Sequence, residues 1–162
     1  MCDRSDRHGT IGAVNANNPA VESLHLVLGD EELLMDRAVA QIVARVRAAA
    51  PGAEDLPVTK LRTGDASAPE LLELLSPSLF AEDRVVVLEA AAEAGKDAVA
   101  LVLDAASDPP EGAVLVIMHS GGGRAKAMVG ALQKAGAVTH ECAKLTKPAD
   151  RVDFVRREFS AA

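Results

Sequence analysis

The feature that most constrains the fold is a pair of short segments that are apolar at nearly every position. Residues 84–88 read RVVVL, and residues 113–118 read AVLVIM. Strands without polar alternation are typical of a parallel sheet with helices on both faces, because a sheet with one solvated face alternates apolar and polar residues. These segments therefore predict buried central strands.

Three more β-rich segments complete a regular alternation with helical stretches. They are LHLVL at residues 24–28, PVTKL at 57–61 and AVTHE at 137–141. Strands that alternate with helices predict the α/β class, here a doubly wound, five-stranded parallel sheet. A chain of 162 residues is long enough to bury the core of one ordinary domain.

The helical stretches carry recognisable signals. The first has an apolar stripe at helical spacing, made of Leu33, Leu34, Ala38, Val39, Ile42, Val43 and Val46. The second opens with Ser67-Ala68-Pro69-Glu70, the spacing of a capping box with proline in the first turn. It continues through Leu71, Leu72, Leu74 and Leu75. The last is expected to start near residues 146–148, with Val152, Val155 and Phe159 on one face.

The end of the second helical stretch raises the question of function. Pro77 lacks an N–H and disfavours helical geometry at Ser76, so the helix must end before Leu79 and Phe80. The chain has only three aromatic residues, all phenylalanine. One of them placed in a connection predicts either a core contact or a contact with a partner.

Composition predicts a soluble protein that does not enter a membrane. Hydrophobic residues make up 49% of the chain, yet no apolar run approaches the roughly 18–20 residues that span a bilayer. Residues 1–20 have no signal-peptide pattern and are expected to be a disordered leader before a domain at 21–162. Cys2 and Cys142 suggest no disulfide framework and favour a reducing cytoplasm, and the histidines have no metal-ligand spacing.

The charge distribution is uneven. The net charge is −7, which argues against nucleic-acid binding by the whole surface. Residues 1–123 carry 9 basic and 20 acidic side chains, whereas residues 124–162 carry 8 basic and 4 acidic ones. The basic C-terminal quarter is either a solvated helix face or a contact for phosphates or an acidic partner.

The first strand-to-helix turn lacks the residues of a phosphate loop, which needs G-x-x-x-x-G-K-[ST]. Gly29 fits, but the places of the second glycine, the lysine and the hydroxyl are taken by Leu34, Met35 and Asp36. The acidic run that starts at Asp30 would repel a triphosphate at the helix N-terminus. The sequence therefore predicts a degenerate nucleotide site, with no ATP binding and no cofactor.

A second glycine-rich turn follows the strand at 113–118. Gly121 to Gly123, with Arg124 and Lys126 behind them, could form an anion-binding nest, or they could be a flexible turn with exposed basic residues. A small α/β enzyme or signalling domain with an anion at the strand carboxyl ends is therefore an alternative function. No catalytic triad or paired carboxylates can be identified from spacing.

Four segments in order resemble the N-terminal domain of the bacterial DNA polymerase III delta subunit, most closely its actinobacterial members. They are LVLGDEELLMDRAV, SPSLFAEDRVVVLEAA, VLVIMHSGGGRAKAM and ADRVDFVRREF, within residues 24–159. The resemblance implies an AAA+-like domain with a P-loop NTPase fold and no working ATP site. It also implies that the lid and collar domains of the family are absent from residues 21–162.

The same resemblance implies a function. Delta is the clamp-loader subunit of the DNA polymerase III holoenzyme that opens the sliding β clamp in the cytoplasm, with no ATPase activity of its own. Residues matching the clamp-binding element are Leu79 and Phe80, with Ser78 before them and Pro77, Ser76 and Leu75 as their frame. Implied partners are the gamma or tau and delta-prime subunits, through the collar. Primed DNA is reached through the assembled loader, with Arg124 and Lys126 as candidate contacts.

Overall fold

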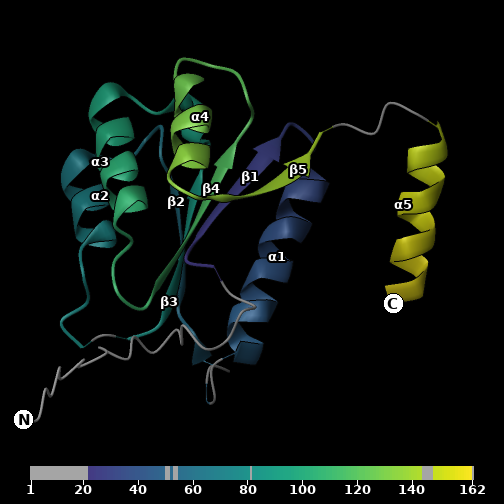
Figure 1. Ribbon diagram of the computed structural model, residues 1–162, viewed down its shortest axis with the longest axis horizontal. Helices are drawn as coiled ribbons and strands as arrows, with labels where there is room; N and C mark the ends of the chain where they lie inside the picture. The colour runs from purple at the N-terminus through teal and green to yellow at the C-terminus, as the bar shows by residue number, and fades with distance from the viewer. Residues whose placement is uncertain (1–21, 50–51, 53–54, 81, 144–147, 162) are drawn as a thin grey trace, which may run out of the picture.

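A computed structural model describes residues 22–49, 52, 55–80, 82–143 and 148–161, so the expected leader at 1–20 lies outside the described residues (Figure 1). All five predicted strands form one parallel sheet with the order β2-β3-β4-β1-β5. The strands are β1 (Leu24–Gly29), β2 (Val58–Arg62), β3 (Arg84–Glu89), β4 (Ala113–His119) and β5 (Val138–Cys142).

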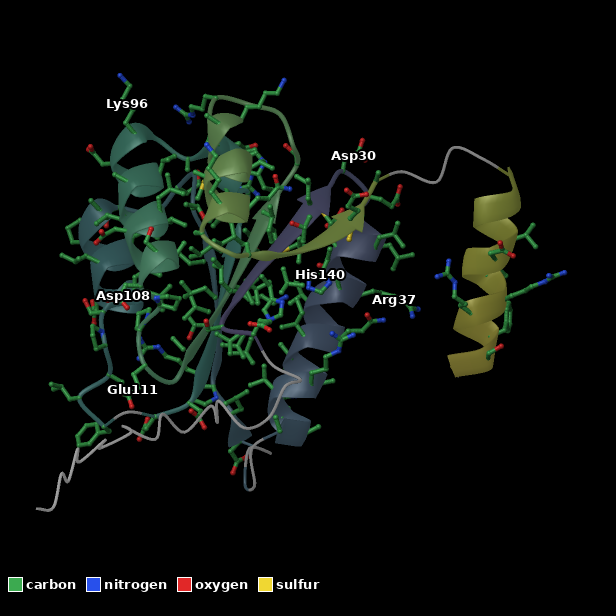
Figure 2. The ribbon with its side chains drawn as sticks, in the orientation of Figure 1. Asp30, Arg37, Lys96, Asp108, Glu111 and His140 are labelled. Atoms are coloured by element: carbon green, nitrogen blue, oxygen red, sulfur yellow. The ribbon has the colours of Figure 1, made fainter. Side chains whose placement is uncertain are left out.

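The sheet has an amino end and a carboxyl end. Because all strands are parallel, each turn that leaves a strand lies at the carboxyl end of the sheet, and each connection that enters a strand lies at the amino end. Figure 2 shows Asp30 at the carboxyl end and Glu111 at the amino end. The predicted central strands are confirmed as buried, and every residue of β4 is buried.

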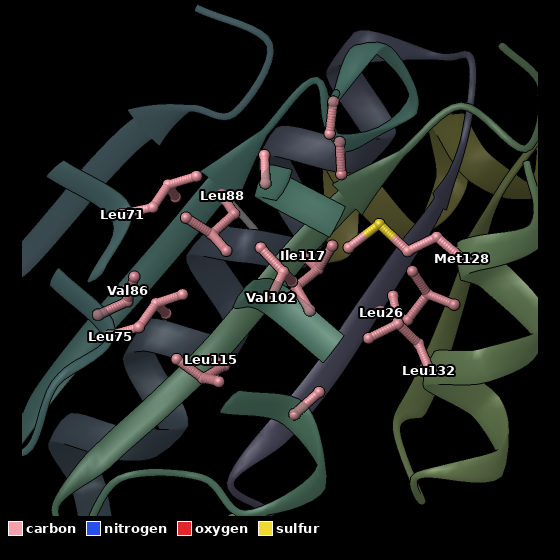
Figure 3. Close-up of a cluster of buried hydrophobic side chains, with 14 of the residues drawn as sticks. Leu26, Leu71, Leu75, Val86, Leu88, Val102, Leu115, Ile117, Met128 and Leu132 are labelled. Atoms are coloured by element: carbon pink, nitrogen blue, oxygen red, sulfur yellow. The ribbon is translucent and has the colours of Figure 1, made fainter. Parts of the chain in front are cut away.

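Helices cover both faces, as predicted for a doubly wound sheet. One face carries α1 (Glu32–Ala49), and the other carries α2 (Ala68–Leu75), α3 (Lys96–Ser107) and α4 (Ala127–Lys134) (Figure 1). A 3₁₀ turn, η2 (Ala91–Glu93), precedes α3. Successive side chains of a strand point to opposite faces, and the core is accordingly divided into two layers. Figure 3 shows the larger layer, in which Leu26, Leu115 and Ile117 of the sheet lie among the residues of the helices.

The predicted stripe of α1 is wrong at its start. Leu33 is 54% exposed, whereas Met35 is buried. The buried positions of α1 are Met35, Ala38, Val39, Ile42, Val43 and Val46. Helical spacing from Ala38 and Val39 leads back to position 35, so the first-turn leucine falls on the solvent side.

Both predicted ends of α2 are confirmed. The Ser67 hydroxyl accepts a hydrogen bond from the Glu70 N–H at 3.4 Å, and the Glu70 carboxylate accepts one from the Ser67 N–H at 2.8 Å. The Ser67 hydroxyl also donates to the Glu70 carboxylate at 2.7 Å. This hydrogen bond and the one from the Ser67 N–H lower the pKa of Glu70. The helix ends at Leu75, and Ser76 is extended with ψ 150° ahead of Pro77.

The last helix, α5 (Pro148–Ala161), begins where the sequence predicted. Its apolar side chains Val152, Val155 and Phe159 are exposed. Among the described helices, none combines the length and the apolar character that crossing a membrane requires.

Candidate functional site

The connection from α2 to β3 presents two large apolar side chains to solvent at the amino end of the sheet. Leu79 is 97% exposed and Phe80 is 81% exposed. The interpretation that this pair packs in the core is therefore wrong. We call Leu79 and Phe80 the plug.

The base of the plug is held by hydrogen bonds although its tip is exposed. The Arg84 guanidinium donates to the carbonyl oxygens of Ser76 and, at 3.5 Å, of Leu74. These are carbonyls at the C-terminal end of α2, where a cation is favoured. The Phe80 N–H donates to the Ser78 hydroxyl oxygen at 3.3 Å. Arg84 thus connects the helix end to β3 and limits the ways in which the plug can move.

Two leucines of α2 differ in their exposure to solvent. Leu75 is 7% exposed and belongs to the core, so it can anchor the segment but offers almost no surface to a partner. Leu72, in contrast, is 57% exposed.

The β1–α1 turn brings Gly29 against β5. A Cβ atom added to Gly29 would overlap the carbonyl group of Cys142, and the Glu31 N–H donates to that carbonyl oxygen at 3.3 Å. An N–H at the start of α1, the kind of group that cradles a phosphate in a nucleotide site, is thus occupied by the protein itself.

The other positions of the degenerate phosphate loop also have structural roles or face solvent. Met35 is buried against the sheet, Leu34 is half-buried, and Asp30 and Asp36 are exposed. Met35, a residue of the core, occupies the position at which a functional phosphate loop has the lysine that contacts the phosphates. The absence of ATP binding stays a prediction, for which this geometry supplies a physical reason.

The second glycine-rich turn is closed by a buried histidine. His119 accepts a hydrogen bond from the Gly121 N–H at Nδ1, at 2.9 Å, and its Nε2 donates to the Ala125 carbonyl oxygen at 3.0 Å. Both ring nitrogens therefore have protein partners, which indicates a structural histidine. Gly123 has φ +73°, and a Cβ there would lie 2.6 Å from the Ala92 carbonyl oxygen.

The predicted anion contacts lie at the same end of the sheet. Arg124 Nε donates to the Glu93 carbonyl oxygen at 2.7 Å, and both Arg124 and Lys126 are exposed. The two residues thus share a surface at the carboxyl end, far from the plug. Their contact with DNA or another anion stays a prediction.

A histidine pair was not anticipated from the sequence. His25 on β1 and His140 on β5 are joined by a 3.1 Å contact between Nδ1 and Nε2, and His25 Nε2 lies 2.8 Å from the Glu22 carbonyl oxygen. Burial, the nearby His140 and Arg45 lower the pKa of His25 to about 4. Burial and Arg45 also lower the pKa of His140. The residues are 115 positions apart, so only the strand register brings them together.

Nothing in the described part of the chain suggests a metal centre or an activated thiol. Among these residues, no three His, Cys, Asp or Glu side chains are placed to hold a metal ion. Burial raises the pKa of the Cys142 thiol, which disfavours the reactive thiolate.

Two solved structures are similar to this chain. The Bacillus subtilis DNA clamp loader delta protein aligns with a TM-score of 0.58 and 18% identity, over 83% of this chain and 42% of that one. A DNA polymerase III gamma subunit-related protein from Thermotoga maritima aligns with a TM-score of 0.47 and 17% identity, over 81% of this chain and 44% of that one. No curated protein sequence matches significantly.

The Bacillus structure shares the α/β fold of this chain, and the present chain spans less than half of its length. The sequence model of one family, described as DNA polymerase III, delta subunit, matches residues 25–142. This match covers well over half of the 162 residues. The chain therefore belongs to the DNA polymerase III delta-subunit family.

Proposed function

We propose that this chain is the clamp-binding domain of a clamp-loader delta subunit and that it inserts the plug into an apolar pocket of the sliding β clamp. The observation that carries the proposal is the near-complete exposure of Leu79 and Phe80. Large apolar side chains on a connection whose base is hydrogen-bonded are typical of interface anchors rather than of an incidental surface.

The energy available from the plug is sufficient for specific docking. Burial of one leucine or phenylalanine side chain contributes about 1.5–3 kcal/mol. The hydrogen bonds from Arg84 to the end of α2 hold the base of the plug in place before binding. Less conformational entropy is then lost on docking, which leaves more of the burial energy for affinity.

Clamp opening requires no covalent chemistry. If the domain binds an opened or strained clamp interface more tightly than a closed one, the difference in affinity shifts the clamp toward the open state. The domain would act as a non-catalytic subunit of the holoenzyme. Assembly with gamma or tau and delta-prime would use a collar domain, and primed DNA would be reached through the assembled loader.

A binding assay with a matched control tests the proposal. Immobilised cognate clamp is titrated with the 162-residue chain, with Leu79→Ala/Phe80→Ala, and with Leu33→Ala/Phe159→Ala. The control removes one exposed leucine and one exposed phenylalanine elsewhere. Loss of the plug should weaken binding by about 4 kcal/mol, or roughly a thousandfold.

The control should bind like the wild type, and neither variant should melt at a much lower temperature because all four side chains are exposed. Equal affinity of the plug variant and the wild type would show that clamp binding does not use this pair.

A further inference from the structure

A cleft lies beside the plug at the amino end of the sheet. It has a volume of about 580 Å³ and lies between the C-terminal ends of α2 and α3 and the connection that enters β4. Its apolar wall includes Leu72, Leu101 and Pro77. Pro77 is two residues before Leu79, so the cleft and the plug are within about 7 Å along the chain. A partner that encloses the plug therefore also reaches this cleft.

The other wall of the cleft is acidic. Asp104, Asp108 and Glu111 line it, all three are exposed, and no lysine or arginine is among its lining residues. Figure 2 shows Asp108 near the end of α3 and Glu111 on the connection that follows. None of the ion pairs within the described residues includes these carboxylates.

The helix ends reinforce the negative potential. The C-terminus of a helix carries a partial negative charge that a lysine or arginine in the last turn usually balances. The last turn of α3 has no basic residue, and its C-cap is Asp108. The last turn of α2 also has none, but Arg84 donates to its carbonyls. The α3 side of the cleft is therefore the part that favours a cation from outside.

We infer that this cleft is a second docking site for the sliding clamp and that it takes a lysine or arginine side chain of the clamp. The inference rests on the proposed function, since it names a further contact of the same surface. The long stem of such a side chain would pack along Leu72 and Leu101, as lysine and arginine stems do on apolar surfaces. Its charged head would lie among Asp104, Asp108 and Glu111. The same carboxylates would repel DNA phosphates, so a nucleic acid does not fit this cleft.

The test neutralises the acidic wall without changing its shape. The variant Asp104→Asn/Asp108→Asn/Glu111→Gln is compared with the wild type for binding to the immobilised cognate clamp. The control, Glu32→Gln/Asp97→Asn/Glu141→Gln, produces the same change in net charge with exposed residues at the carboxyl end of the sheet. We expect the cleft variant to bind about fivefold more weakly at low salt, and the difference to shrink at high salt because exposed charges are screened.

The control should bind within twofold of the wild type. A cleft variant that binds as tightly as the wild type, or more tightly, overturns the inference. If the plug variant loses binding in the same assay while the cleft variant does not, the proposed function stands and only the second site fails. If the wild type does not bind the clamp at all, both fail.

Discussion

The His25–His140 pair predicts that the domain loses stability in mildly acidic solution. His25 is buried, and its pKa in the folded protein is about 4, below the ordinary value of 6.5. In the folded protein Nε2–H of His25 donates to the Glu22 carbonyl oxygen and Nδ1 accepts from His140. A second proton could therefore bind only at Nδ1, where it would break the hydrogen bond with His140. The folded state therefore disfavours protonation of this ring.

The sign and size of the effect follow from this difference in pKa. As the pH falls through 6.5, the unfolded chain takes up the proton first, so the free energy of unfolding decreases until the pH reaches about 4. Between pH 7.5 and pH 5 the loss from His25 is about 2 kcal/mol. For a domain of this size the melting temperature should fall by roughly 4–8 °C.

The assay is thermal unfolding of the wild type and of His25→Asn at several pH values from 7.5 to 5. Asparagine keeps an acceptor for the His140 N–H but does not titrate, so the variant should lose at least half of the pH dependence even if it is less stable at pH 7.5. Carboxylates such as Asp83, whose pKa is raised by burial, are common to both proteins and cancel in the comparison. The same fall in melting temperature for both proteins, or a flat wild-type profile, would refute the reasoning.

Two further predictions concern the two ends of the sheet, each with a control substitution. Gly29→Ala forces a Cβ onto the Cys142 carbonyl and should lower the free energy of unfolding by at least about 2 kcal/mol in thermal melts. Gly130→Ala, in open space on α4, should instead be neutral or stabilising, and equal effects would contradict the close-approach argument. Arg84→Met removes the donor to Ser76 and should weaken clamp binding about tenfold in the same surface assay, with partial recovery in Arg84→Lys. A melting change without an affinity change would show that Arg84 does not position the plug.

Much of the fold could be predicted because its signals are local. Strands without alternation, the Ser67–Glu70 capping box and Pro77 each restrict the backbone within a few residues. For Leu79 and Phe80 the sequence left two outcomes open, a contact in the core or exposure for a partner. A proline fixes where a helix ends, but it does not decide whether the next side chains turn toward the core.

The remaining features depend on contacts between distant segments. The histidine pair requires that β1 and β5 be neighbours with Val27 opposite His140. The acidic cleft requires that α2 and α3 end side by side. None of these juxtapositions has a signature within a single segment.

The topology places the plug and the basic turn at opposite ends of the sheet. The plug lies on a connection that enters β3, whereas Arg124 and Lys126 follow the turn that leaves β4. With six residues in β3 and seven in β4, and about 3.3 Å for each residue of a strand, the ends are roughly 20 Å apart. A clamp segment bound at the plug would therefore leave the basic turn accessible. The degenerate phosphate loop lies at the carboxyl end with that turn, so the residues that replace a phosphate loop in the β1–α1 turn do not disturb the geometry of the plug.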